Sequence, residues 1–123
     1  LNVYVMCEVP SNVILADEFL DVFDGMSIGT NDLTQLSLGM DRDNAKIAGI
    51  TDERDPTIKK MLSKVINRCN ERNKYNGICG EAPSTYPEFA EFLQEENIDS
   101  MSLNPNRVIK TILILGGEED KIQ

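Results

Sequence analysis

The alternation of four short apolar runs with helical stripes is the feature that most restricts how this chain can fold. The runs lie at residues 2–7, 25–29, 75–79 and 98–103, and each has the length of a single strand. Each is followed by a segment whose apolar residues recur at helical spacing. Strand–helix units in series predict parallel strands with helices packed outside the sheet. We therefore expect an α/β fold with about four parallel βα units, which is half of a (β/α)8 TIM-type barrel, with unpaired strand edges.

The expected helices have recognisable starts. Ser11 or Asn12 is positioned to cap the first, and Asp55 followed by Pro56 is a strong N-terminal signal for the longest. Another begins at Pro87, a short one follows residues 30–32, and the last follows residues 104–105 and stops at Gly116 and Gly117. The apolar stripes expected to face the core are Val13, Ile14, Ala16, Phe19, Leu20 and Phe23; Leu33 and Leu36; Ile58, Leu62, Val65, Ile66 and Cys69; and Phe89, Phe92 and Leu93. Residues 39–54 are polar and predict an irregular loop.

Composition excludes several functional classes. The net charge is −9, from 21 acidic and 12 basic residues, which argues against binding to a nucleic acid backbone. No apolar run approaches the roughly 20 residues that span a bilayer, so no membrane partner is expected. The chain has three cysteines without a CxxC pair, which favours a reducing, cytoplasmic setting. It has no histidine, so neither a Ser-His-Asp triad nor a phosphohistidine can form within it.

Polar residues stand where the expected strands end. Glu8 follows the first strand, Asn31 and Asp32 follow the second, Cys79 ends the third, and the fourth offers Asn104. Function collects at this edge of parallel α/β folds. Two carboxylates from neighbouring strands suit Mg²⁺, which leaves its other positions to water and substrate oxygens. A bound 2-oxo acid would complete such a site, with the metal stabilising its enolate.

Each of these residues also has a structural interpretation. Glu8 can be a solvated loop acid, and Asn31 or Asp32 can cap the helix that follows. Cys79 can be a small buried hydrophobe, as most free cysteines are. The acidic and basic residues at 41–43 can form a salt-bridge patch in the loop. Cys7 and Cys69 are read as packing residues.

Four segments resemble the phosphoenolpyruvate-utilising enzymes, most closely the synthases among them. MCEVPSN at residues 6–12 is similar to a metal-binding segment, and SIGTNDLTQ at 27–35 is similar to the signature of the wider family. GICGEAPS at 77–84 resembles the segment of the catalytic cysteine, and SMSLNP at 100–105 resembles the closing strand. The resemblance implies that residues 1–117 are the C-terminal part of a phosphoenolpyruvate- and pyruvate-binding (β/α)8 domain. Residues 118–123 would be an acidic tail.

The resemblance also implies roles for individual residues. Glu8 and Asp32 would ligate Mg²⁺, the one cofactor expected. Asn31 and Arg42 would contact the transferred phosphoryl group, for which an amide N–H and a guanidinium fork are suited. Cys79 would be the general acid and base, protonating the enolate carbon as thiol and removing a pyruvate methyl proton as thiolate.

Backbone N–H groups near Gly80 would help to orient the substrate. Two positions depart from the synthase pattern, which commonly has Gln at Glu81 and Asp at Thr85. A carboxylate at Glu81 that points inward would raise the pKa of the neighbouring thiol.

The activity implied for the complete protein is that of a phosphotransferase, the pyruvate, water dikinase. It converts ATP, pyruvate and water to phosphoenolpyruvate, AMP and phosphate. Its partners would be pyruvate or phosphoenolpyruvate and the upstream phosphohistidine and ATP-binding domains of the same protein, and we expect the fragment alone to be inactive. Two alternatives stay open: a non-catalytic half-barrel that assembles through its strand edges, for example as a homodimer, and the equivalent domain of Enzyme I of the sugar phosphotransferase system or of pyruvate phosphate dikinase.

Overall fold

The four expected strands form one parallel sheet in the computed structural model of the chain, which describes residues 1–39, 54–80, 82–103 and 105–116. The strands are β1 (Tyr4–Cys7), β2 (Gly25–Gly29), β3 (Tyr75–Cys79) and β4 (Ser100–Met101), and they lie side by side in chain order. Helices connect successive strands, as parallel pairing requires. The α/β fold with four parallel βα units is therefore confirmed.

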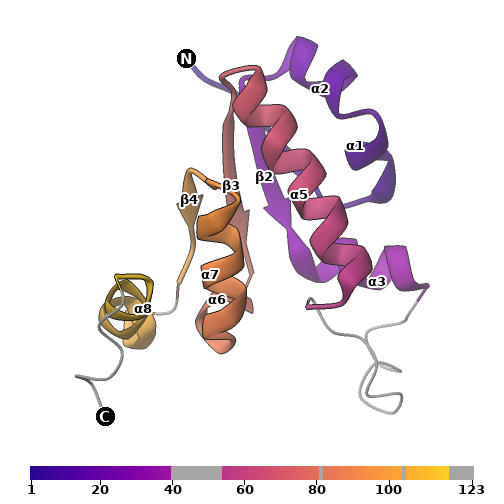
Figure 1. The fold of residues 1–123 in the computed structure, drawn as a ribbon. Helices are drawn as coiled ribbons and strands as arrows, with labels where there is room; N and C mark the ends of the chain where they lie inside the picture. Colours follow the sequence, from indigo (N-terminus) through magenta and orange to yellow (C-terminus); the bar gives the residue numbers. More distant parts are fainter. Residues whose placement is uncertain (40–53, 81, 104, 117–123) are drawn as a thin grey trace.

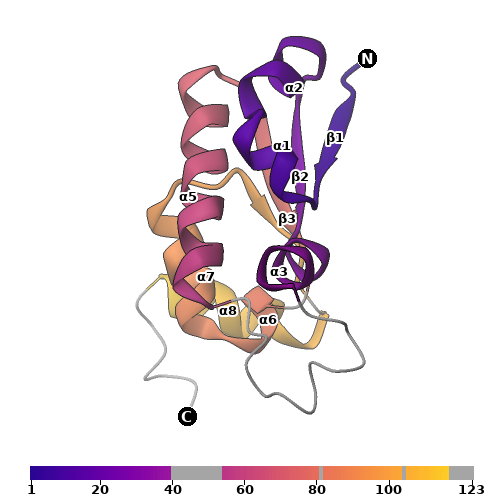
Figure 2. The same cartoon turned by 90° about the vertical axis from the view of Figure 1, so that its right-hand side faces the viewer.

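Helices cover one face of this sheet, and the other face is open among the described residues (Figures 1 and 2). Side chains alternate accordingly along the strands: those toward the helices are buried, with Val5 and Met101 at the margin only partly so, while those opposite are exposed or half-buried. The buried set is Cys7, Met26, Ile28, Asn76 and Ile78. The opposite set, which we call the open face, is Tyr4, Met6, Ser27, Tyr75 and Cys79. A half-barrel has this asymmetry, because its inner face has no second half to pack against.

Helix α5 (Pro56–Glu71) is the main cover of the sheet, and the sequence predicted it in detail. Asp55 is its N-cap, with the carboxylate accepting a hydrogen bond from the Thr57 backbone N–H at 2.8 Å. Pro56 occupies the first helical position. All five predicted core positions of this helix are completely buried, and they join the residues of the covered sheet face in one core.

The first helical segment differs from the prediction. It is broken into α1 (Pro10–Ile14) and α2 (Ala16–Val22), with Leu15 between them in a non-helical conformation. The helix begins at Pro10, so neither Ser11 nor Asn12 is its N-cap. Ile14, which was predicted to face the core, lies outside it with 69% of its surface exposed.

The remaining elements are close to expectation, with three differences. Helix α3 (Thr30–Leu38) buries Leu33, but Leu36 is exposed and does not face the core. A short helix, α6 (Ala82–Thr85), precedes α7 (Pro87–Glu95) and was not predicted. The last strand is only two residues long, shorter than the predicted run at 98–103, and it pairs with Gly77 and Ile78 of β3. The chain then continues through a 3-10 turn, η1 (Pro105–Arg107), into α8 (Val108–Leu115).

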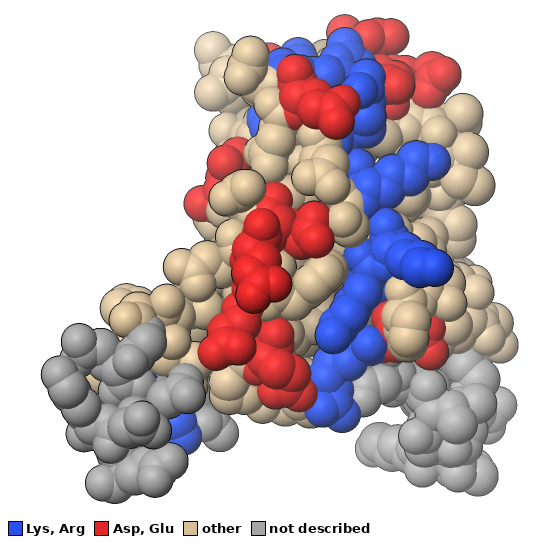
Figure 3. All heavy atoms as spheres, viewed as in Figure 1, with Lys and Arg blue, Asp and Glu red and all other residues tan. Residues whose placement is uncertain are grey.

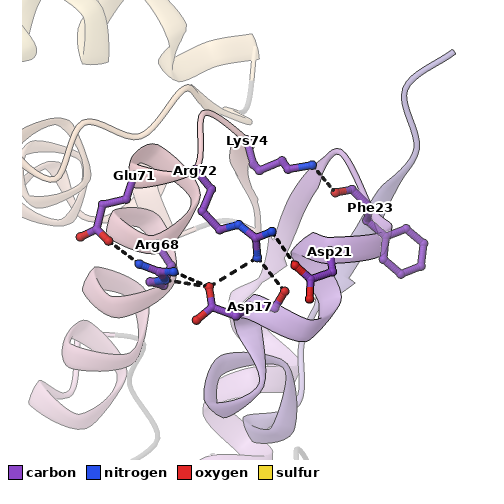
Figure 4. Close-up of polar contacts among 7 residues, drawn as sticks. All are labelled: Asp17, Asp21, Phe23, Arg68, Glu71, Arg72 and Lys74. Atoms are coloured by element: carbon purple, nitrogen blue, oxygen red, sulfur yellow. Dashed lines mark hydrogen bonds and ion pairs between the residues drawn. The ribbon is translucent and has the colours of Figure 1, made fainter.

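Ion pairs join α2 to the C-terminal end of α5 (Figure 4). Arg68 Nε donates to Asp17 Oδ1 at 2.8 Å, and Arg72 Nη2 donates to Asp21 Oδ1 at 2.6 Å. Arg72 also donates to the Asp17 carbonyl oxygen at 2.7 Å. The hydrogen bond from Arg68, with the positive charges of both arginines, lowers the pKa of the Asp17 carboxyl. These contacts fasten the broken first helix onto the main helix.

The outer surface of the helices carries both signs of charge (Figure 3). Lys and Arg side chains form a band along α5, and Asp and Glu side chains form a neighbouring band along α7. The two helices are also bridged by Ser63, whose hydroxyl donates to Glu96 Oε2 at 2.8 Å. In the described part of the chain, no helix combines the length and apolarity needed to cross a membrane.

Candidate functional site

Five of the six predicted site residues line one pocket at the carboxyl ends of β1, β2 and β3. This pocket has a volume of about 180 Å³ and opens to solvent. It is lined by Met6, Glu8, Gly29, Asn31, Asp32, Cys79 and Gly80. The sixth predicted residue, Arg42, lies outside the described residues, as do Glu81 and Asn104. Three chain segments far apart in sequence thus meet where parallel α/β folds place their ligands.

The first strand brings Glu8 to the pocket. Cys7 and Glu8 point in opposite directions at the end of β1, so the thiol enters the core and the carboxylate faces the pocket. Glu8 is half-buried and lies against Gly29 of the neighbouring strand: a Cβ atom at Gly29 would stand 3.3 Å from Glu8 Cβ and 3.4 Å from Glu8 Oε2. The lack of a side chain at Gly29 therefore makes room for the carboxylate.

The second strand passes directly into α3, whose first turn supplies Asn31 and Asp32. Gly29 is the N-cap of this helix, so neither polar residue caps it as the structural interpretation required. Both side chains are exposed at the pocket. An aspartate in the first turn is also favourable for the helix itself, because the N-terminal end carries a partial positive charge.

The third strand ends at Cys79, which is half-buried and has two polar neighbours. Its Sγ is 3.3 Å from the carbonyl oxygen of Ile28, to which the thiol donates. The hydroxyl of Ser27 lies 3.8 Å from the same sulfur, as a donor to it. Gly80 follows with a φ of +134°, which turns the chain away from the strand in a conformation that favours glycine.

The other two cysteines differ from Cys79 in their surroundings. Cys7 and Cys69 are both completely buried in the core, which confirms their assignment as packing residues. Burial, with smaller contributions from nearby Cys69 and Glu8, raises the pKa of Cys7 to about 12. Burial likewise raises the pKa of Cys69 to about 11, with Asp99 adding to the effect. Of the three thiols, only Cys79 reaches solvent.

The donor set of the pocket fits a hard cation with open coordination positions. Among the described residues no group of three or more Cys, Asp or Glu side chains is arranged to enclose a metal. Mg²⁺ does not need such a group, since it commonly takes one or two carboxylates and fills its other positions with water and substrate oxygens. Glu8, just after β1, and Asp32, in the first turn of α3 after β2, supply two carboxylates from adjacent βα units.

A second, larger pocket of about 290 Å³ lies at the amino end of β3, away from this site. It is lined by Asn70, Asn73, Lys74, Tyr75 and Asp99. Its polar groups are engaged in holding the fold: the Asn70 amide donates to the backbone carbonyls of Glu96 and Asn97, and the Asp99 carboxylate accepts from the Asn76 backbone N–H. These hydrogen bonds give Asn70 and Asp99 a structural role that needs no bound ligand.

Met6 and Gly29 are pocket residues that the sequence interpretation missed. Met6 shares a strand face with Glu8, two residues on, so the two-residue period of a strand would have placed it beside the site. Gly29 pairs with Cys79 in the β2–β3 register. Its position could have been inferred from that pairing, but its contact with Glu8 depends on the side-chain conformation of the glutamate.

Comparison with known proteins identifies the family of the chain. Residues 1–117 match the profile of the family described as PEP-utilising enzyme, PEP-binding domain. The phosphoenolpyruvate synthase of Synechocystis sp. is 60% identical over 113 residues, which are 92% of this chain and 14% of the relative. The phosphoenolpyruvate synthase of Pseudomonas aeruginosa is 53% identical over 121 residues (98% of this chain, 15% of the relative), and that of Escherichia coli is 50% identical over 115 residues (94% and 14%). The chain therefore spans only about a seventh of the length of these relatives. On this evidence the chain belongs to the PEP-utilising enzymes, as a member of their PEP-binding domain family.

Proposed function

We propose that this chain supplies the Mg²⁺- and pyruvate-binding part of a pyruvate, water dikinase, together with its acid–base cysteine. The observation that carries the proposal is the meeting of Glu8, Asp32 and Cys79 in one pocket, from three different βα units. Two carboxylates and an accessible thiol at the carboxyl ends of parallel strands suit enolate chemistry. The high identity to enzymes named phosphoenolpyruvate synthase supports this reading.

Glu8, just after β1, and Asp32, in the first turn of α3, would both ligate the cation. When bound, Mg²⁺ would stabilise the enolate oxygen of the substrate as a Lewis acid. A 2-oxo acid has a carboxylate and a carbonyl oxygen that can chelate such an ion, and a pocket of about 180 Å³ suits a molecule of this small size. The amino end of α3 borders the same pocket and favours a negatively charged group there.

Cys79 would exchange a proton with the methyl carbon of the substrate. As thiolate it takes one methyl proton from pyruvate, so that the C–H bond electrons pass into the enolate. In reverse, the S–H proton goes to the enolate carbon and the thiolate is restored. The hydroxyl of Ser27 lies 3.8 Å from the sulfur and supplies a hydrogen-bond donor to it.

Asn31 and the backbone at Gly80 border the space in which the substrate would lie, and they would help to bind its phosphoryl and carboxylate oxygens. Arg42 is proposed to join them. In the complete protein the phosphoryl group would come from ATP through a phosphohistidine on an upstream domain, because this chain has no histidine. The reaction would form phosphoenolpyruvate, AMP and phosphate in the cytoplasm, and the fragment alone is expected to be inactive.

Calorimetric titration with oxalate, a mimic of the pyruvate enolate, tests the proposal. We expect saturable binding to the folded chain that requires Mg²⁺ and that is lost in Asp32→Asn, which keeps the shape of the side chain but removes its charge. Circular dichroism would establish that both proteins are folded. Oxalate binding that is independent of Mg²⁺, or equal in the variant, would contradict the proposed metal site.

Assembly is a second candidate function, favoured by the open face of the sheet. Tyr4 and Met6 are 43% and 42% exposed there, and Tyr4 stacks on Tyr75 with ring centroids 4.4 Å apart. Strand β1 also has an unpaired edge among the described strands. Sedimentation analysis would decide whether a second copy covers this face, since a lasting monomer at high concentration would count against it.

A further inference from the structure

The turn between β1 and α1 is held by the side chain of one residue, Asn12. Its Oδ1 accepts hydrogen bonds from two consecutive backbone N–H groups, that of Glu8 at 3.2 Å and that of Val9 at 3.1 Å. Its own backbone N–H donates to the Val9 carbonyl oxygen at 2.9 Å. Asn12 is only 6% exposed. One buried amide oxygen thus fixes the two peptide groups on either side of the Glu8 Cα atom.

The local sequence makes this arrangement necessary. Glu8 and Val9 have left the strand and not yet entered the helix, so neither ladder nor helix satisfies their N–H groups. Pro10 follows as the first helical residue and has no N–H of its own. Asn12 stands two residues later in the first turn, where its side chain can reach back to these groups.

The other side of Glu8 is fixed by the neighbouring strand. Its Cβ and Oε2 lie against Gly29, at distances that leave no space for a methyl group without displacement. The backbone of Glu8 is therefore held by Asn12, and its carboxylate rests on β2 at the edge of the pocket. These two contacts restrict the directions in which the carboxylate can point.

We propose that Asn12 is a positioning residue for Glu8, which it holds ready for the cation before the cation binds. The inference rests on the proposed function, since it assumes that Glu8 is a metal ligand. Asn12 itself does not line the pocket. Its effect is on affinity: ligands held in place by their surroundings bind a metal more tightly than ligands that must be ordered on binding.

Two substitutions at Asn12 separate this role from packing. Asn12→Leu has a similar shape without the acceptor oxygen, whereas Asn12→Asp keeps an oxygen at the same place. Asn70→Leu is a matched control, because Asn70 also bonds two backbone groups but lies at the opposite end of the sheet. Mn²⁺ serves as the probe, with the free ion measured by electron paramagnetic resonance. Hydrogen exchange of the Glu8 and Val9 amides is measured by NMR on the same samples.

We expect Asn12→Leu to weaken Mn²⁺ binding by about tenfold, the low end of what loss of a supporting partner of a metal ligand costs. The Glu8 and Val9 amides should exchange faster in this variant. Asn12→Asp should restore amide protection and affinity, and Asn70→Leu should leave Mn²⁺ affinity unchanged even if it lowers stability.

The outcomes distinguish the inference from the function on which it rests. Wild-type Mn²⁺ affinity in Asn12→Leu, or an equal loss in Asn70→Leu, would overturn the role of Asn12 and leave the proposed metal site standing. A folded wild-type chain that binds no Mn²⁺ would overturn the metal site, and with it the role of Asn12.

Discussion

Two glycines of the open face should respond very differently to the same substitution. A Cβ atom at Gly25 of β2 would clash most closely with the Tyr75 carbonyl oxygen, and would lie 2.7 Å from Tyr75 Cβ and 2.9 Å from the Tyr75 carbonyl carbon, where ordinary contact begins at 3.4 Å. These atoms are the peptide group and the Cβ atom of Tyr75, which cannot move without the backbone of β3, so strands β2 and β3 would have to move apart. A Cβ atom at Gly77 would instead meet the outer ring atoms of Tyr75 and, at 2.6 Å, the Ser100 hydroxyl. These are side-chain ends that can rotate away.

The expected costs follow from this difference. Gly25→Ala should lower the free energy of unfolding by about 3 kcal/mol or more, at the upper end of what overpacking costs. Gly77→Ala should cost about 1 kcal/mol or less, because it breaks the hydrogen bond between Tyr75 and Ser100 but gains from the lower backbone entropy of alanine in the unfolded chain.

Urea unfolding followed by circular dichroism would measure both values. With a slope of about 1–3 kcal/mol per molar urea, a difference of about 2 kcal/mol between the variants moves the midpoints apart by roughly 1 M. Equal midpoints, or a Gly25→Ala variant as stable as the wild type, would show that β2 and β3 do not approach each other as described and would refute the reasoning.

Three further predictions concern other parts of the molecule. Iodoacetamide at pH 8 should modify the folded chain once, at Cys79, because Cys7 and Cys69 are buried and their pKa values are raised. Mass spectrometry that shows a second adduct on the wild type, or one adduct on Cys79→Ser, would contradict this. Asp17→Asn should reduce the free energy of unfolding at pH 7. The hydrogen bond from Arg68 lowers the pKa of the Asp17 carboxyl, which means that the ionised carboxylate stabilises the folded chain. This stabilisation should fade as the pH falls below about 4 and the carboxylate is protonated, so urea midpoints that differ equally at pH 7 and pH 2.5 would count against the prediction. Thr34→Val should leave the unfolding free energy unchanged or raise it by about 1 kcal/mol, because the buried Thr34 hydroxyl has no hydrogen-bond partner within the described ranges. A clearly lower melting temperature of the variant would contradict this.

The sequence predicted the elements that carry strong local signals. The Asp55–Pro56 start and the five-residue stripe after it define α5, because an N-cap, a proline at the first position and a sustained helical period agree. The strands were found as short apolar runs, and their parallel order follows from the helices between them. Where signals are weak, the prediction failed. The stripe from Val13 to Phe23 fits one helix as well as two, since a break at Leu15 changes the spacing little.

The candidate site was predictable to a similar degree. Parallel strands bring their carboxyl ends together, so Glu8, Asp32 and Cys79 were expected at one edge, and the pocket contains all three. The support of Glu8 by Asn12 was not predictable, because an asparagine near a helix start is usually its cap. Only the backbone path of the turn shows that the side chain reaches back instead. Arg42 stays a prediction, since it lies outside the described residues.

A crystal structure of the chain with Mn²⁺ and oxalate would test the central claim most directly. The anomalous signal of Mn²⁺ identifies the ion without reference to the ligands around it. We predict one peak within bonding distance of the Glu8 and Asp32 carboxylates, with oxalate completing the coordination and Cys79 Sγ facing it from β3. A peak that involves neither carboxylate, or oxalate bound away from this pocket, would contradict the account.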